Sequence, residues 1–416
     1  MKNRKEISWA LYDWANSAFA TTIMAGFFPI FFKKYWSLES DVTESTFHLG
    51  LANGFAGLII AIMAPILGAI ADKGGHKMKF LMFFTYLGIL ASLSLSLVSQ
   101  GLWPFAIIIY ILGNIGFSGA NIFYDSLIVW ICDSDKRDQL SSLGFSLGYL
   151  GGGLLFALNV AMTMFPEFFF LKDSTQAVKL SFALVAIWWA IFSIPLFISI
   201  KEEKKKIGPL TAIKKGLKEI QDTLKHLKQQ KNIYLFLIGY WFYIDGVDTI
   251  IRMAVDYGLS LGFESKNLIM GLLITQFIGF PATLVYAQLA KKIGTKNGIY
   301  LAILIYSLGT IAASFMTSVK EFYFLAAIIG LVQGGIQALS RSYYSRLIPK
   351  EKSAEYFGFY NMLGKFAVVI GPILMGTVAK FTGSPRTSIL SLLLLFGLGA
   401  LCLVNVKEVD NANQPS

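Results

Sequence analysis

Long apolar runs recur along the whole chain and constrain its fold more than any other feature. Each run holds about 20 residues, which is enough for a helix to cross about 30 Å of hydrocarbon. We predict twelve such spans, at residues 7–32, 46–71, 80–99, 103–131, 139–164, 179–200, 232–258, 266–290, 297–316, 321–347, 354–380 and 386–405. Runs of about 10 alternating residues, which are typical of a transmembrane β-barrel, do not occur in the sequence. The sequence therefore predicts an all-α integral membrane protein with twelve transmembrane helices.

The composition and the placement of charge agree with this fold. The 416 residues are 55% hydrophobic and only 15% charged, with a mean hydropathy of +0.60, whereas a soluble protein carries roughly 25% charged residues. Most of the 36 lysines and arginines fall in tails and loops on the side that holds both termini. By the positive-inside rule we predict cytoplasmic termini, in the inner membrane of a bacterium. The net charge of +11 follows from this bias, so binding to a nucleic acid is not needed to explain it.

A polar segment separates the first six predicted spans from the last six. After Pro209 its apolar residues recur at steps of three and four, as on one face of a helix. These residues are Leu210, Ile213, Leu217, Ile220, Leu224 and Leu227. We therefore predict an N-terminal six-helix half at 1–200, a cytoplasmic amphipathic linker at 201–231, a C-terminal six-helix half at 232–405 and a cytoplasmic tail at 406–416. The linker could lie on an anionic membrane surface or pack on the protein's own loops, and the sequence leaves both open.

Eight ionisable side chains lie inside the predicted spans, and one of them, Asp256, is near the outer end of its span, where it could simply lie at the membrane interface. A charge at membrane depth costs at least about 3 kcal/mol on insertion scales, so it faces protein or water and commonly has a function. The eight are Asp13, Asp125, Asp245, Asp248, Arg252, Asp256, Arg341 and Lys365. Such a polar interior points to the movement of a polar solute across the membrane.

Polar residues share one face in four of the predicted helices. Positions i, i+4, i+7 and i+11 lie within about 60° at about 100° per residue. The stripes are Asp13, Asn16, Ser17 and Thr21 in the first span; Asn114, Ser118, Asn121 and Asp125 in the fourth; Asp245, Asp248, Arg252 and Asp256 in the seventh; and Gln333, Gln337, Ser340 and Tyr344, with Arg341 one step round, in the tenth. Each of these spans is the first of a group of three, so the pattern predicts a central polar cavity.

Structural roles compete with functional ones at these positions. Asp248 and Arg252 are one turn apart and could simply neutralise each other. Asn114 and Ser118 could join helices by hydrogen bonds. Lys365 has no acid nearby in its own span, so it needs a carboxylate from another helix or from a substrate. These alternatives stay open at the level of sequence.

A short loop after the second span resembles a known signature. Residues 68–77, GAIADKGGHK, resemble the loop between helices 2 and 3 of the major facilitator superfamily, with His76 in place of the usual Arg. The resemblance implies a gating role for the members of this loop that match the signature. They are Gly68, Asp72, Lys73, Gly75 and Lys77.

Three more segments are similar to the autophagy-related vacuole-effluxer family and its bacterial relatives within that superfamily. They are residues 9–19 (WALYDWANSAF), 243–250 (YIDGVDTI) and 357–365 (FGFYNMLGK). The resemblance implies two pseudo-symmetric six-helix halves that alternate access to a cavity walled by helices 1, 4, 7 and 10. It also implies efflux of amino acids.

The combined interpretation is a secondary active transporter that moves a small polar solute, with a neutral amino acid as the favoured class and proton-coupled efflux as the favoured mode. A sugar, a nucleoside or a peptide is the alternative solute. An intramembrane enzyme is the rival class, but the sequence shows neither a His-Glu-x-x-His motif nor paired Gly-Asp motifs, and it has no nucleotide-binding P-loop. We expect no enzymatic activity, no cofactor and no metal, and a monomer surrounded by membrane lipid.

The sequence nominates two overlapping sets of functional residues. The candidate substrate-binding residues are Asp13, Asn16, Asn121, Asp245, Asp248, Arg252, Gln337 and Lys365. The candidate proton-coupling residues are Asp13, Asp125 and Arg341. A buried carboxylate can load and release a proton as the cavity opens to alternate sides, while Arg341 could instead hold one of the acids ionised.

Overall fold

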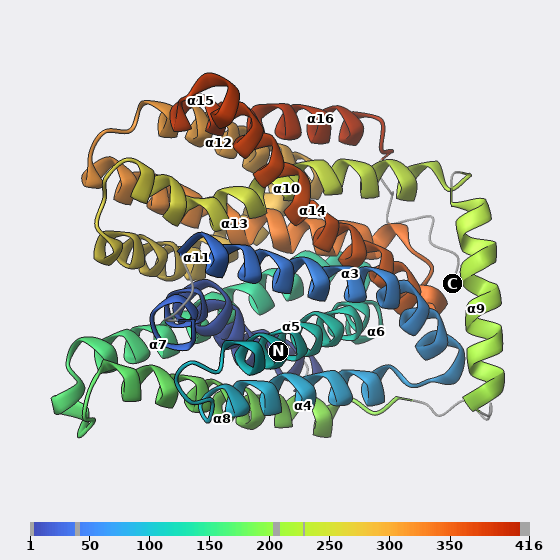
Figure 1. Ribbon diagram of the computed structural model, residues 1–416. Coiled ribbons are helices and arrows are strands. Elements are labelled where there is room, and N and C mark those ends of the chain that lie inside the picture. The colour runs from blue at the N-terminus through green and yellow to red at the C-terminus, as the bar shows by residue number, and fades with distance from the viewer. Residues whose placement is uncertain (1–3, 38–41, 203–208, 228, 408–416) are drawn as a thin grey trace.

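The computed structural model describes residues 4–37, 42–202, 209–227 and 229–407, and Figure 1 shows that helices make up nearly all of them. Within these ranges, twelve helices are long and apolar enough to cross a membrane, and no strand occurs. The predicted all-α membrane fold is therefore confirmed. The predicted tail lies almost wholly outside the described residues.

The helices before the linker form the first six spans. The first span is α1 (Arg4–Ala18), continued by the π-helical η1 (Phe19–Phe27), α2 (Phe28–Phe31) and the π-helical η2 (Phe32–Trp36). The next five are α3 (Val42–Gly74), α4 (Lys77–Leu95), α5 (Trp103–Ser126) with α6 (Ile128–Ile131), α7 (Arg137–Met164) after the turn η3 (Ser134–Lys136), and α8 (Ser174–Ser199) after the turn η4 (Pro166–Phe169).

The linker helix and the last six spans follow. The linker contains α9 (Pro209–His226). The spans are α10 (Lys231–Ser260), α11 (Ser265–Ile293), α12 (Thr295–Phe315), α13 (Val319–Leu347), α14 (Ser353–Thr382) after the turn η5 (Lys350–Lys352), and α15 (Pro385–Leu390) with α16 (Leu392–Val404). We call the spans before α9 the N-half and those after it the C-half.

Local sequence explains where several helices begin or turn. The Ser318 side chain accepts a hydrogen bond from the Glu321 N–H while the Glu321 carboxylate accepts the Ser318 N–H, a reciprocal cap that starts α13. Asp173 caps α8 by accepting the N–H of Gln176. Gly75 has a φ of +63° between α3 and α4, a conformation that glycine adopts without a steric penalty.

Two pairs of helices make the most extensive contacts between the halves: α3 packs along α14, and α7 packs along α11. In Figure 1 the blue α3 lies beside the orange-red α14. Their crossing is very close, because a methyl group on Gly68 would overlap the carbonyl of Ala354, and one on Gly358 would meet the Ala64 carbonyl oxygen at 2.5 Å. Larger residues at these positions would push the two halves apart.

The helix α9 lies across one end of the bundle, at a steep angle to the spans (Figure 1). It packs on the last turns of α3. The start of α1 and the end of α8 lie at the same end as each other, because the Ser8 hydroxyl donates to the Ser199 hydroxyl at 2.9 Å. The chain enters α9 directly after α8, so we call this end of the bundle the α9 end.

Candidate functional site

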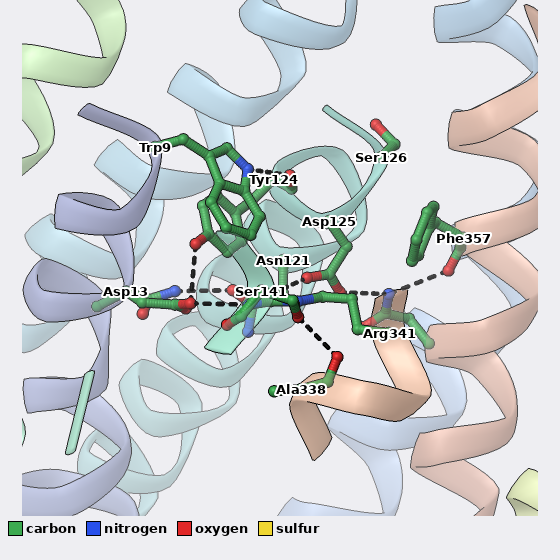
Figure 2. Close-up of polar contacts among 12 residues, drawn as sticks. Trp9, Asp13, Asn121, Tyr124, Asp125, Ser126, Ser141, Ala338, Arg341 and Phe357 are labelled. Carbon is green, nitrogen blue, oxygen red and sulfur yellow. Dashed lines mark hydrogen bonds and ion pairs between the residues drawn. The ribbon is translucent and has the colours of Figure 1, made fainter. Parts of the chain in front are cut away.

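Arg341 of α13 reaches from the C-half between two acids of the N-half, as Figure 2 shows. Its Nη1 donates to Asp125 Oδ1 at 3.0 Å, and its Nη2 donates to Asp13 Oδ2 at 3.2 Å. Its Nε donates to the Ser141 hydroxyl at 2.9 Å, and Nη2 also donates to the Ser141 carbonyl at 3.0 Å. The Arg341 side chain is only 2% exposed, so water screens these charges weakly. We call Asp13, Asp125, Ser141 and Arg341 the ion cluster.

Aromatic rings and a glycine enclose the guanidinium of the ion cluster. Its central carbon lies 4.7 Å from the ring centre of Trp9 and 4.2 Å from that of Phe145, where ring faces attract a cation. The Tyr124 hydroxyl donates to Asp13 Oδ2 at 2.8 Å. A methyl group on Gly144 would meet the same oxygen at 2.5 Å. The helix α7 can therefore pass this close to the cluster only because residue 144 has no side chain.

The ion cluster contains two carboxylates and one guanidinium. It therefore keeps one negative charge in excess when all three groups are ionised. Asn361 of α14 donates to Asp125 Oδ2 at 3.2 Å, a neutral contact that does not remove the excess. A single proton on either carboxylate would balance the charge.

Two further hydrogen bonds involve residues of the predicted polar stripes. Asn16 of α1 donates to Asn121 Oδ1 of α5 at 2.7 Å. The Tyr149 hydroxyl of α7 donates to Gln337 Oε1 of α13 at 2.9 Å, which also joins the two halves. Asn114, by contrast, donates to the Tyr110 carbonyl of its own helix at 3.2 Å, so this bond does not join two helices.

The acids of α10 lie in two environments. Asp245 is 1% exposed, and its Oδ1 accepts the Gly371 N–H at 2.9 Å and the Thr249 hydroxyl at 3.2 Å, so this carboxylate faces α14. Asp248 is half-buried and lies within electrostatic reach of Tyr149 of α7. Asp248 lies within the same reach of Tyr240 and Tyr306, which belong to the C-half.

The remaining candidates of the C-half are placed only in part. Lys365 is half-buried on α14, which packs against α10, so it and Asp248 lie on adjacent helices. The predicted substrate residue Arg252 and its neighbour Asp256 have side chains outside the described residues.

Asp72, at the end of α3, holds the first turn of α14. Its Oδ2 accepts the Glu355 N–H at 2.8 Å, and its Oδ1 accepts the Ala354 N–H at 3.3 Å. Lys77 Nζ lies 2.7 Å from the same Oδ1. The first N–H groups of a helix lack partners within it and carry partial positive charge, so a carboxylate is favoured there. The loop that resembles the superfamily signature thus ties the halves together at the α9 end.

Replacing Asp72 with Asn is expected to shift the protein toward a state that is open at the α9 end. The loss of charge at the helix terminus, roughly 0.3–1 kcal/mol, is enough to bias two conformers of nearly equal energy. Cysteine accessibility or spin-label distances across the α9 end would report the shift. Asp173→Asn is the matched control, because Asp173 caps only its own helix. Identical distances in Asp72→Asn and wild type would count against this role.

A second ion pair joins the halves at the α9 end. Arg346 Nη2 of α13 lies 2.8 Å from Asp138 Oδ2 of α7, and Asp138 also accepts hydrogen bonds from Thr295 and Ser342. Arg137 Nη1 donates to a carbonyl of α13 at 2.8 Å. Sequence reasoning missed this pair, because nothing in its sequence context separates it from the ordinary charges at span ends.

The helix α9 is bound to both halves by Glu219. Its two carboxylate oxygens lie 2.8 Å from Lys73 Nζ of the N-half and 2.5 Å from Lys352 Nζ of the C-half. Hydrogen bonds from Lys352 and then Lys73 hold the pKa of Glu219 below its ordinary value.

The attachment of Glu219 is expected to depend on pH in one direction. Because the pKa is lowered in the folded state, the contribution is present above the ordinary Glu range and is lost as pH falls through the lowered pKa. Spin-label mobility on α9 should therefore rise in strongly acidic solution. Glu219→Gln should show the raised mobility already at neutral pH. Equal mobility in the variant and wild type at neutral pH would contradict the attachment.

One cavity lined by described residues lies away from the ion cluster. It lies within the C-half and encloses about 750 Å³, part of which is open to solvent. Its walls come from all the helices of the C-half, α10 to α16, and are apolar apart from a few groups such as Thr275 and Gln333. Among the side chains that the structure describes, no acid or base lines this cavity.

Comparison with known proteins agrees with this architecture. The family model "Vacuole effluxer Atg22 like" matches residues 40–136 and 131–414. The chain is 38% identical over 408 residues to YxiO of Bacillus subtilis, described as an uncharacterised MFS-type transporter, and the match covers 97% of this chain and 95% of that one. It is 24% identical over 474 residues to autophagy-related protein 22 of Vanderwaltozyma polyspora, covering 97% and 91% of the two chains.

A solved structure shares the fold. The crystal structure of the human organic anion transporter MFSD10 superposes with a TM-score of 0.73 at 14% identity, covering 96% of this chain and 99% of that one. The likeness to this structure shows the fold alone, whereas the family match spans most of the sequence. The chain is a transporter of the major facilitator type and belongs to the Atg22-like vacuole-effluxer family.

Proposed function

We propose that the protein exports a small zwitterion, a neutral amino acid, across the bacterial inner membrane in exchange for protons. The N-half (1–200) and the C-half (232–405) alternately expose a shared site, and the α9 end with both termini faces the cytoplasm. The family match and the excess of lysine and arginine at this end support the proposal.

The ion cluster is the observation that carries the proposal. It is shared between the halves, so the α9 end can open only when Arg341 parts from Asp13 and Asp125. Two carboxylates would then remain without their buried cation. A proton is the smallest charge that can replace the guanidinium, so opening at this end and protonation favour each other. This linkage is what a proton-coupled transporter needs.

The substrate contacts are assigned from the charges on adjacent helices. Lys365 on α14 binds the carboxylate of the amino acid, and an acid of α10 binds its ammonium group. Asp245 is enclosed against α14 in this conformation, so Asp248 is the acid that can reach the ammonium group first. Asn16, Asn121 and Gln337 supply neutral hydrogen-bonding groups around the same interior.

Counterflow in proteoliposomes tests the proposed solute class. Vesicles loaded with unlabelled neutral amino acids should accelerate the uptake of a labelled amino acid, whereas sugars, nucleosides and dipeptides should not. Exchange with a sugar or a nucleoside alone would replace the proposed substrate. An intramembrane enzyme would show no accelerated exchange with any solute.

The acids of the ion cluster are expected to couple transport to protons. A pH gradient should drive net amino-acid movement by the wild type. In Asp125→Asn or Asp13→Asn the gradient should lose its effect while exchange without a gradient persists, because an amide cannot carry the proton. Asp133→Asn, at an exposed acid outside the cluster, is the control. Wild-type flux that ignores the gradient would refute proton coupling and leave the solute assignment standing.

A further inference from the structure

The linker helix α9 presents three different faces. The first packs on the protein: Ala212, Ile220 and Thr223 are buried, and Gly216 lies against Ile70 of α3. The side chains on this face are mostly small, which lets α9 lie close to the end of α3. One of the two alternatives left open by the sequence, packing on the protein itself, therefore accounts for this face.

The second face of α9 is apolar and exposed. Leu210 is 76% exposed, Ile213 40%, Leu217 43% and Leu224 53%. At about 100° per residue these four lie within about 60° of one another, and their centre is roughly 90° from the centre of the buried face. This angle is expected for a helix that lies at the membrane surface beside a transmembrane bundle. One face of such a helix contacts the protein, and a second face, about a quarter-turn away, contacts the bilayer.

The third face of α9 is basic and borders the apolar face on its other side. It carries Lys214, Lys218 and Lys225, all exposed. An exposed aliphatic strip bordered by lysines matches the surface of an anionic membrane, where apolar side chains enter the acyl boundary and lysines meet phosphate groups. The position of α9 at the end of twelve membrane-spanning helices brings that surface within its reach (Figure 1).

We propose that α9 binds anionic phospholipid, with its aliphatic face in the membrane surface and its lysine face on the headgroups. Glu219 of the same helix pairs with Lys73 of the N-half and Lys352 of the C-half. The bound lipid would therefore also stabilise this connection between the two halves. The proposal is independent of which solute is transported.

Spin-label accessibility tests the contact with lipid. The label is placed at Leu217→Cys, on the aliphatic face, or at Thr211→Cys, which is exposed on another side, in a background with Cys132→Ser and Cys402→Ser. In vesicles of phosphatidylglycerol and phosphatidylcholine, the label at 217 should be accessible to oxygen and shielded from a water-soluble nickel chelate. The label at 211 should show the reverse. Equal exposure of both labels to the nickel chelate in these vesicles would overturn the proposal.

The lysines are tested by varying the lipid charge. Raising the phosphatidylglycerol fraction should increase the shielding of the label at 217. The triple variant Lys214→Gln/Lys218→Gln/Lys225→Gln should lower the preference for anionic lipid by about fivefold per lysine, on the order of a hundredfold in total.

The control is Lys172→Gln/Lys320→Gln/Lys380→Gln, which removes the same charge from the opposite end of the bundle. It should leave the preference unchanged. An undiminished preference in the α9 triple variant would overturn the role of the lysines. Shielding that arises with soluble poly-glutamate but not with anionic lipid would assign the face to an acidic protein instead.

Discussion

Replacing Arg341 with glutamine is expected to abolish transport and to release the closure of the α9 end. The variant leaves Asp13 and Asp125 buried without the cation that both contact in the wild type. Removing one partner of a buried ion pair costs on the order of 3–5 kcal/mol. Arg341→Lys should fail as well, because one ammonium group cannot reproduce the forked contacts to two carboxylates and Ser141. Flux in proteoliposomes measures the loss.

Two companion variants separate this role from general misfolding. Arg386→Gln removes an arginine whose guanidinium donates to the Met316 carbonyl within the C-half, so it should leave flux intact. Adding Asp13→Asn and Asp125→Asn to Arg341→Gln removes the uncompensated charges, so it should restore thermal stability without restoring gradient-driven transport. Wild-type flux in Arg341→Gln would contradict the account of the ion cluster.

Replacing Lys365 with alanine is expected to weaken substrate binding by at least about tenfold. Truncating one partner of a buried, hydrogen-bonded charge pair costs on the order of 2–5 kcal/mol. The lost partner here is the proposed contact of the substrate carboxylate. Isothermal calorimetry or a thermal-shift titration of purified protein with the amino acid measures the change.

The matched control for Lys365 lies on the same helix. Lys380 is exposed near the far end of α14, so Lys380→Ala should bind the amino acid as the wild type does. Asp248→Asn should weaken binding of the zwitterion but not of a des-amino analogue that retains the carboxylate. Undiminished affinity in Lys365→Ala would exclude the proposed carboxylate contact.

The transmembrane helices could be predicted because their signal lies within each segment. A run of about 20 apolar residues must span the bilayer as a helix wherever its neighbours lie. The ends of the runs were less informative. The first span runs from Arg4 to Trp36 rather than over 7–32, and the fifth begins at Ser134 rather than at 139. Helical hydrogen bonding continues past an apolar run where polar and aromatic side chains can reach the membrane surface.

The candidate site could be predicted only up to the faces of single helices. Spacing along α1 and α5 identified Asp13 and Asp125, and the tenth span supplied Arg341. Spacing within one helix does not tell which helix its face will meet, so the joint contact of Arg341 with both acids depended on tertiary packing. The same limit explains why the enclosure of Asp245 by α14 could not be foreseen.

The linker shows a different limit of sequence patterns. The aliphatic stripe predicted one apolar face, yet four of its six residues are exposed and face away from the protein. The face that packs on α3 is built largely from Ala212, Gly216 and Thr223, which contribute little hydrophobicity. Small residues identify close packing only when the partner helix is known.

The central claim is that the ion cluster and the Asp72 contacts hold the α9 end closed and must break during transport. Spin labels at Asp135→Cys in η3 and Glu351→Cys in η5, both exposed and in opposite halves, measure the separation directly by pulsed dipolar spectroscopy. Cys132→Ser and Cys402→Ser provide the background. The account predicts a dominant short distance in the wild type and a second, longer distance that becomes dominant in Arg341→Gln. A single unchanged distance in both proteins, with transport lost only in the variant, would contradict it.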